Sequence, residues 1–199
     1  MKKLVLASNN PKKMQELNAL LAPLGFEVIA QSQLGIPEAE EPHCTFVENA
    51  LAKARHAAKL AALPALADDS GLCVAALAGA PGVYSARYAQ TAAGEPKSDA
   101  RNNQKLLAEL DGQANRAAHF VSVIVLVRHA DDPQPLIAEG EWHGEILPAA
   151  RGEGGFGYDP LFYLAEYDKS AAELDAQTKN AISHRGRAMQ QLIARLPGF

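Results

Sequence analysis

The chain has few of the residues and patterns that mark secreted, metal-stabilised or membrane-bound folds. Its 199 residues include two cysteines, Cys44 and Cys73, which form no C-x-x-C pair, so a zinc site is not indicated and a reducing compartment suits both thiols. No apolar run approaches the length of a membrane span, and the apolar segment at residues 4–7 is too short for the core of a signal peptide. We therefore expect a cytoplasmic protein with no membrane partner.

An excess of positive charge is also missing. Lys and Arg number 19 against 23 Asp and Glu, which gives a net charge of −4. Proteins that bind a nucleic-acid polymer usually carry a broad basic surface, so we do not expect that function, although a local basic pocket is compatible with this balance. A chain of this length buries more than half of its unfolded surface and needs no disulfide or metal to fold. We expect residues 1–199 to form one domain, with room for two lobes.

The order of strand and helix patterns favours an α/β fold with a mixed sheet. Asn10 and Pro11 mark a helix start, as N-cap and first-turn proline, and Gly25 ends that helix. Thr45 and Glu48 form a capping box at the start of a second helix. Further helices are expected at residues 98–110 and 178–196, and strands at residues 4–7, 26–30, 65–67, 120–127 and, as a pair broken near Gly144, 136–147.

The first strand–loop–helix junction, at residues 8–13, has the features of an anion site. A helix start presents unpaired backbone N–H groups and the positive end of the helix dipole, and anions bind there. Lys12 and Lys13 are unfavourable in a first helical turn unless an anion offsets their charge, and Ser8 and Asn10 offer neutral hydrogen bonds to phosphate oxygens. The alternative is that Asn10 only caps the helix and both lysines are solvated. The segment is not a P-loop, because G-x-x-x-x-G-K-[ST] is absent.

Paired carboxylates form a second candidate site. Asp68 and Asp69 stand at the predicted end of a strand, where open α/β sheets place ligands, and Glu41 lies in an acidic loop upstream. If these groups converge, they suit Mg²⁺, which takes a few carboxylates together with substrate phosphates. Lys53, on the capped helix, either neutralises phosphate or extends into solvent. The alternative makes the aspartates a turn cap and the glutamate a solvated surface residue.

A glycine-rich loop and the last helix supply the third set of candidates. The string at residues 152–157 matches G-x-G-x-x-G, but Pro160 disfavours the helix that a dinucleotide site requires. Glycines around Phe156 and Tyr158 instead suit stacking on a base, worth about 1–3 kcal/mol, unless both rings fill the core. Arg185 is able to donate two hydrogen bonds to O6 and N7 of a 6-keto purine. A lone histidine such as His184 is more often structural.

Six motifs in this order closely resemble those of the inosine triphosphate pyrophosphatase family, the bacterial non-canonical purine NTP pyrophosphatases. Each motif alone is weak, but the set is highly specific, and the likeness runs from residue 4 to about residue 196. The motifs are Ser8-x-Asn10-x-x-Lys13, Glu41, Asp68-Asp69-Ser70-Gly71-Leu72, Gly79-Ala80-Pro81-Gly82, Gly155-Phe156-Gly157-Tyr158-Asp159-Pro160 and Ser183-His184-Arg185.

The resemblance implies an elongated mixed sheet flanked by helices, two lobes with the active-site cleft between them, and a homodimer. It implies Mg²⁺-dependent hydrolysis of dITP, ITP and XTP to the monophosphate and pyrophosphate, by attack of an activated water on the α-phosphorus. Such a reaction removes deaminated purines from the nucleotide pool.

The same resemblance assigns roles residue by residue. Asp69 is the implied proton acceptor, with Lys53 beside it, and Mg²⁺ is assigned to Glu41, Asp68 and Asp69. Substrate binding is assigned to Ser8, Asn9, Asn10, Pro11, Lys12, Lys13 and Ser70 on the triphosphate side, and to Gly155, Phe156, Gly157, Tyr158, Asp159, Lys179, Ser183, His184 and Arg185 on the base side.

Two other functions are compatible with part of this set. A Maf-like pyrophosphatase acting on pyrimidine or modified nucleotides shares the N-terminal phosphate motif, but residues 156–160 and 183–185 weigh against it. A non-catalytic nucleotide-binding module is the second alternative, and the intact set of Glu41, Asp68 and Asp69 argues against it.

Overall fold

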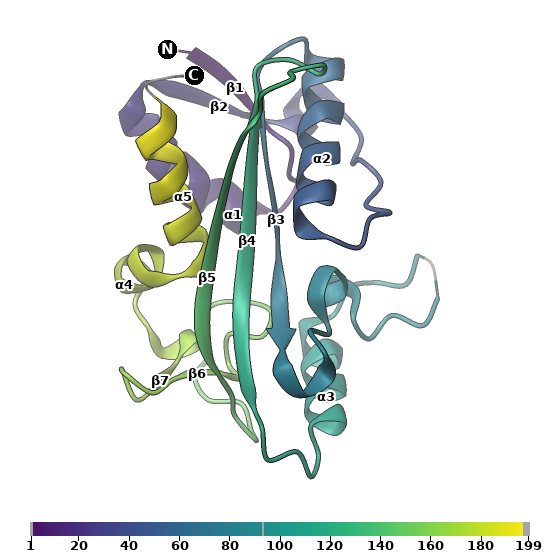
Figure 1. Cartoon of the computed structure of the whole chain (residues 1–199), viewed down its shortest axis with the longest axis vertical. Helices are drawn as coiled ribbons and strands as arrows, with labels where there is room; N and C mark the ends of the chain where they lie inside the picture. Colours follow the sequence, from purple (N-terminus) through teal and green to yellow (C-terminus); the bar gives the residue numbers. More distant parts are fainter. Residues whose placement is uncertain (1, 93, 197–199) are drawn as a thin grey trace. The chain divides into compact units, whose positions relative to one another are not determined.

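A computed structural model describes residues 2–92 and 94–196 of the chain. Within these residues, seven strands form one sheet in the order β2-β1-β3-β4-β5-β6-β7 (Figure 1). β1 is parallel to β2 and β3, whereas β6 is antiparallel to β5 and β7. This mixed sheet, with helices packed on it, confirms the predicted α/β fold.

The strands and α-helices have the following bounds. The strands are β1 (Lys2–Leu6), β2 (Phe26–Ala30), β3 (Ala65–Val74), β4 (Ala117–Val127), β5 (Leu136–Ile146), β6 (Phe162–Leu164) and β7 (Lys169–Ser170). The helices are α1 (Pro11–Leu21), α2 (Phe46–Ala61), α3 (Asp99–Glu109), α4 (Ala176–Ile182) and α5 (His184–Arg195). Among the described residues, no helix is both long enough and apolar enough to cross a bilayer.

The chain divides into two compact units, which are described one at a time. The first unit comprises Met1–Asp69, Ser122–Gly140 and Arg185–Phe199, and the second comprises Ser70–Val121 and Glu141–His184. The chain passes from one unit to the other within β3, β4 and β5 and at the start of α5.

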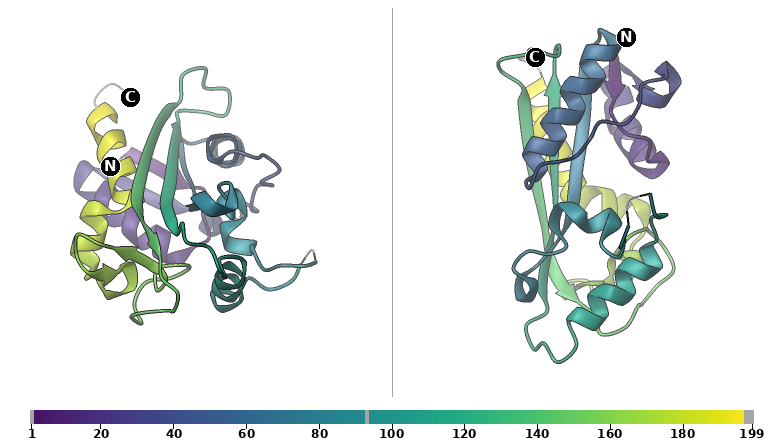
Figure 2. Two further views of the ribbon diagram at one scale, coloured as in Figure 1. Left: turned by 60° about the horizontal axis from the view of Figure 1, so that its bottom comes forward. Right: turned by 90° about the vertical axis from the view of Figure 1, so that its right-hand side faces the viewer.

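The first unit packs helices against both faces of its strands. Leu4 and Leu6 of β1 share a buried cluster with Leu17 of α1 and Met189 of α5. Val5, between the two leucines, is also buried and faces the opposite side, because successive side chains of a strand alternate. The alanines of α2 are buried as well, and Figure 2 shows α2 and α5 on opposite sides of the strands.

The turn between β4 and β5 is organised in the first unit by Asp132, which is fully buried. Its carboxylate accepts hydrogen bonds of 2.7–3.0 Å from the backbone and guanidinium of Arg128 and from the backbone N–H of Gln134. Hydrogen bonds from Arg128 hold the pKa of Asp132 well below its usual range. The carboxylate therefore satisfies two backbone N–H groups that the turn leaves without a strand partner.

Replacement of Asp132 by Ala is expected to lower the free energy of unfolding by about 2–3 kcal/mol, because these donors lose a charged acceptor. Urea unfolding at neutral pH measures the difference. Asp131→Ala, an exposed carboxylate one residue away, is the matched control and should change the free energy by less than about 0.5 kcal/mol. Equal losses in both variants would contradict the role given to Asp132.

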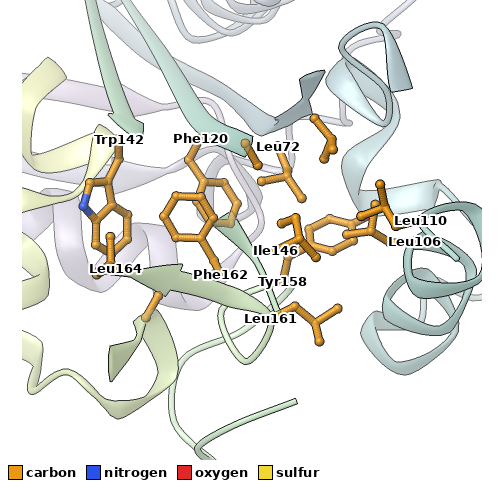
Figure 3. Packing of buried hydrophobic residues seen from close by; sticks show 13 residues of the cluster. Leu72, Leu106, Leu110, Phe120, Trp142, Ile146, Tyr158, Leu161, Phe162 and Leu164 are labelled. Carbon is orange, nitrogen blue, oxygen red and sulfur yellow. The ribbon is translucent and has the colours of Figure 1, made fainter. Parts of the chain in front are cut away.

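The second unit has a separate aromatic core. Phe120 of β4, Trp142 of β5 and Phe162 of β6 lie with ring centroids 4.6–6.4 Å apart (Figure 3). Leu106 and Leu110 of α3 are buried in the same cluster. The core thus joins α3 to the strand ends of this unit and supports the glycine-rich loop that follows β5.

Three expectations from the sequence are corrected. β3 does not end at residue 67 but continues to Val74, β5 is one unbroken strand, and the last helix is two helices separated by Ser183, whose backbone is extended. Gly144 does not break β5. It allows the close approach of β6, since a Cβ at this position would lie 2.5 Å from the carbonyl oxygen of Tyr163.

The helix starts are confirmed. Asn10 caps α1, Thr45 caps α2 and Ser98 caps α3, each through a side-chain oxygen that accepts a backbone N–H. Helix caps depend on neighbouring residues only, which explains why the sequence locates them well.

Candidate active site

The carboxylates of the candidate site lie inside β3, beyond the point where its neighbour β1 stops. β1 makes its last pair between Leu6 and Leu66, and the chain then leaves the sheet toward α1. Asp68 and Asp69 are therefore within a strand, not at its end as the sequence suggested. The rule that ligands bind at carboxyl ends of parallel strands applies to β1 instead.

The start of α1 differs from the predicted anion site in one respect. The side-chain oxygen of Asn10 accepts the backbone N–H groups of Lys12 and Lys13, at 3.0 and 3.1 Å, and the Ser8 hydroxyl accepts the N–H of Asn10 at 3.2 Å. These backbone donors are thus paired, which corrects the expectation of free N–H groups. The Asn9 side chain donates to Glu38. Lys12 is exposed, whereas Lys13 extends inward.

Asp68 is fully buried and is held between cations. Its carboxylate lies 2.6 Å from the ammonium of Lys13 and 3.3 Å from the guanidinium of Arg185, and it accepts a 2.5 Å hydrogen bond from the Ser122 hydroxyl. Burial alone would raise the pKa of Asp68, but the two cations outweigh it and hold the pKa well below the usual range. This arrangement suits a carboxylate that orients two cations better than it suits a direct metal ligand.

Glu41, Lys53 and Asp69 form the second charged group of the first unit. The Lys53 ammonium is 2.8 Å from Glu41 Oε1 and 2.6 Å from Asp69 Oδ1, and it also donates to the carbonyl of Asp68. The second carboxylate oxygen of Asp69, Oδ2, is buried and has no hydrogen-bond partner within the described residues. Burial raises the pKa of Asp69, and Lys53 offsets part of that shift. A raised pKa makes this carboxylate a better proton acceptor.

The donor set of this group fits Mg²⁺ bound together with substrate. Among the described residues, no three His, Cys, Asp or Glu side chains gather as a complete metal cage. Mg²⁺ does not require one, because it usually takes one or two carboxylates and completes its shell with phosphates and waters. Glu41 and Asp69, brought together by Lys53 and with Oδ2 of Asp69 unpaired in the described residues, meet that requirement.

In the second unit, three residues expected to contact the base come together. Asp159 Oδ2 accepts the backbone N–H of Phe156 at 2.7 Å and lies 2.5 Å from the Lys179 ammonium. The same ammonium is 5.0 Å from the centroid of the Phe156 ring. Gly155 has φ +73°, and a Cβ there would lie 2.1 Å from Asp159 Oδ2, so only glycine fits beside this carboxylate.

Two residues of α3, which the sequence did not indicate, bind the backbone of Gly157 in this loop. The backbone N–H of Gly157 donates to Asp99 at 2.7 Å, and the Asn103 side chain donates to the Gly157 carbonyl at 3.0 Å. Asp99 and Asn103 are four residues apart and lie on one face of the helix. Only their spacing, opposite a loop 54 residues later, would have indicated the contact.

Tyr158 and His184 occupy the core of the second unit. Tyr158 is 3% exposed, and its hydroxyl donates to the Ser85 carbonyl. His184 stacks on Phe120 with ring centroids 4.9 Å apart. Both placements match the structural alternatives left open by the sequence. Ser183 is buried beside His184, and Ser70 is half-buried in β3.

Arg185 lies with first-unit carboxylates. Its guanidinium is 2.6 Å from Glu16 and 3.3 Å from Asp68, and its side chain is 5% exposed. Burial alone would lower the pKa of Arg185, but Asp68 and Glu16 outweigh it and keep the group charged. A base contact by Arg185 would therefore compete with two ion pairs.

Comparison with known proteins identifies the family. Residues 4–195 match the model of the Ham1 family. The chain belongs to the Ham1 family. Among its Ham1-family relatives, a dITP/XTP pyrophosphatase of Ralstonia nicotianae is 68% identical over 100% of this chain and 98% of its own, and one of Aromatoleum aromaticum is 70% identical over 98% and 96%.

Solved structures of the family agree with the fold. A HAM1 protein from Coxiella burnetii is 50% identical and superposes with a TM-score of 0.92 over 100% of both chains. The Ham1 protein of Staphylococcus aureus is 42% identical, with a TM-score of 0.88 over 99% of both chains.

Proposed function

We propose that this Ham1-family chain hydrolyses dITP, ITP and XTP to the nucleoside monophosphate and pyrophosphate, and so removes deaminated purines from the nucleotide pool. The observation that carries the proposal is the group of Asp69, Lys53 and Glu41, in which a buried carboxylate oxygen faces no partner among the described residues. The relatives in Ralstonia and Aromatoleum are named dITP/XTP pyrophosphatases, which supports dITP and XTP as substrates.

In the first unit, Asp69 would accept a proton from the attacking water through Oδ2, the oxygen that Lys53 does not engage. Glu41 and Asp69 would hold Mg²⁺ or its water ligands, and the ion would supply charge neutralisation on the pyrophosphate leaving group. Lys53 orients both carboxylates, and Lys13, Ser8 and their neighbours in residues 8–13 would bind the phosphates. Asp68 keeps Lys13 in place.

In the second unit, the half-buried ring of Phe156 would stack on the base. Lys179 lies near that ring, and Asp159 binds the backbone N–H of Phe156 and the Lys179 ammonium. Both side chains would contact the edge of the base. The Lys179 ammonium would favour a keto oxygen over an amino group there. His184 remains a proposed contact of the base, whereas Arg185 belongs to the first unit, where it pairs with Glu16 and Asp68. Gly155 and Gly157 give the loop the positive φ angles that this placement needs.

We further propose a homodimer, as the family resemblance implies, and a cytoplasmic location, as the cysteine usage and the lack of a signal-peptide pattern suggest. Sedimentation at equilibrium tests the first point directly, since the dimer has twice the 21.2 kDa of the chain.

The first experiment incubates purified protein with Mg²⁺ and dITP, XTP, dGTP, dATP or dTTP, and assays pyrophosphate separately from orthophosphate. We expect pyrophosphate from dITP and XTP and little from the other three. Pyrophosphate mainly from dTTP would favour the Maf-like alternative, and orthophosphate as the first product would place the attack at another phosphorus. Tight dITP binding without turnover would favour the alternative of a non-catalytic nucleotide-binding module.

A further inference from the structure

One face of α2 holds the loop that carries Glu41. Asn49, Lys53 and His56 follow one another at helical spacing of four and three residues and so lie on one face. Asn49 bonds the backbone of His43, Lys53 bonds the Glu41 carboxylate, and His56 donates to the Pro37 carbonyl at 3.0 Å. Residues 37–43 therefore contact α2 along their length, and Figure 1 shows the segment running beside the helix.

Asn49 makes the most specific of these contacts. Its side chain accepts the His43 N–H and donates to the His43 carbonyl, both at 3.1 Å. This pair of bonds fixes the orientation of the amide, since only one assignment of its oxygen and nitrogen satisfies both. Asn49 is 1% exposed, although His43 itself is exposed. The buried side chain of Asn49 thus holds both the backbone N–H and the backbone carbonyl of His43, a residue at the surface.

The backbone between His43 and Glu41 is conformationally restricted, so the position of His43 limits the position of Glu41. Pro42 stands between them, and its ring fixes φ near −65°. A proline also restricts the preceding residue, here Glu41, to extended conformations. Fixing His43 therefore fixes the direction from which the Glu41 carboxylate approaches Lys53 and Asp69.

We propose that Asn49 is a positioning residue that sets Glu41 for metal binding through its two hydrogen bonds to His43. The inference rests on the proposed function of Glu41 and deepens it. Partners that orient metal ligands from the next layer typically change metal affinity or activity by about 10–100-fold when removed. Asn49 has this place relative to Glu41, although it touches neither a metal nor a substrate.

The test compares Asn49→Ser with the wild-type chain in two measurements. Hydrogen exchange of residues 38–45, without metal, should become at least about tenfold faster in the variant, because the His43 amide loses its acceptor. The Mg²⁺ concentration for half-maximal dITP hydrolysis should rise about tenfold, while KM for dITP at saturating Mg²⁺ should change less than about threefold. Helix α2 should keep its exchange protection.

Asn102→Ser is the matched control. Asn102 is also a buried asparagine on a helix, and its side chain bonds the backbone of Ala89, Ser85 and Ala86 in the second unit. We expect a comparable loss of thermal stability in this variant, with the exchange of residues 38–45 and the Mg²⁺ requirement unchanged.

The proposal is overturned if Asn49→Ser loses stability but keeps the wild-type Mg²⁺ requirement, or if Asn102→Ser raises that requirement equally. A wild-type chain that does not hydrolyse dITP would overturn the proposed function instead. In that case hydrogen exchange still tests whether Asn49 restrains the loop, since unchanged exchange at residues 38–45 in Asn49→Ser would show that it does not.

Discussion

Asp69→Asn is expected to lower kcat for dITP at least about 10³-fold, because a general base alone contributes about 10²–10⁴-fold and this change also removes a carboxylate from the Mg²⁺ site. The substitution keeps size and shape. The amide oxygen is able to replace Oδ1 as an acceptor for Lys53, but an NH₂ group in place of Oδ2 cannot accept a proton.

The fold should survive this change. Lys53 keeps Glu41 as a counter-ion at 2.8 Å, and Asp69 has only one hydrogen-bonded oxygen among the described residues. Steady-state kinetics and thermal unfolding are measured on the same preparation, with Asp131→Asn as an exposed carboxylate control. A variant that is folded and retains more than a tenth of wild-type kcat would exclude Asp69 as the base.

Asp68→Asn is expected to have the opposite profile, with a large effect on stability. We expect the free energy of unfolding to fall by about 3–5 kcal/mol, since removing one partner of a buried pair leaves uncompensated charge. Asp68 faces both Lys13 and Arg185. Within residues 2–92 and 94–196, Arg185 has a second carboxylate within 4 Å, Glu16, and Lys13 has none. Urea unfolding in the presence of a chelator measures the loss.

Ser122→Ala is the reference variant against which the stability loss of Asp68→Asn is compared. It removes one hydroxyl donor to Asp68 and leaves both ion pairs, so we expect a loss of about 1–2 kcal/mol. If Asp68 served mainly as a metal ligand, its replacement would relieve repulsion between carboxylates, and the metal-free variant would match or exceed wild-type stability.

The stability contributed by Asp68 should also depend on pH in one direction. Its pKa is lower in the folded chain than the value of about 3.9 in an unfolded chain, so its contribution is complete above the unfolded pKa. The difference between wild type and Asp68→Asn should be constant from about pH 7 to pH 5 and shrink below about pH 4. A difference that widened on acidification would contradict the ion-pair assignment.

The sequence predicted those elements whose cause is local. Asn10 with Pro11, and Thr45 with Glu48, determine helix starts from adjacent residues, and the structure places α1 and α2 there. The length of β3 was not predictable in the same way. Aspartate and glycine are depleted in strands, and Asp68 is tolerated within β3 because Lys13, Arg185 and Ser122 arrive from other elements.

In the candidate site, too, features with a local cause were predictable and contacts between distant residues were not. Residue types identified Glu41, Asp69 and Lys53 as a group, and the structure brings them within hydrogen-bond distance. Glu16 and Asn103 carried no signal of their own, because their partners lie 169 and 54 residues away in the chain. A polar stripe through Asn49, Lys53 and His56 in an alanine-rich helix was the one local sign of the contact with residues 37–43.

The ammonium of Lys53 has a consequence for the chain before any cofactor arrives. Two carboxylates brought together for a divalent ion would repel one another without a counter-ion, but here a cation from α2 lies between them. We therefore expect folding to be independent of metal supply, unlike that of proteins whose ligands converge only when the ion binds. A newly synthesised chain should therefore reach its folded state at a low Mg²⁺ concentration, before substrate and ion bind together.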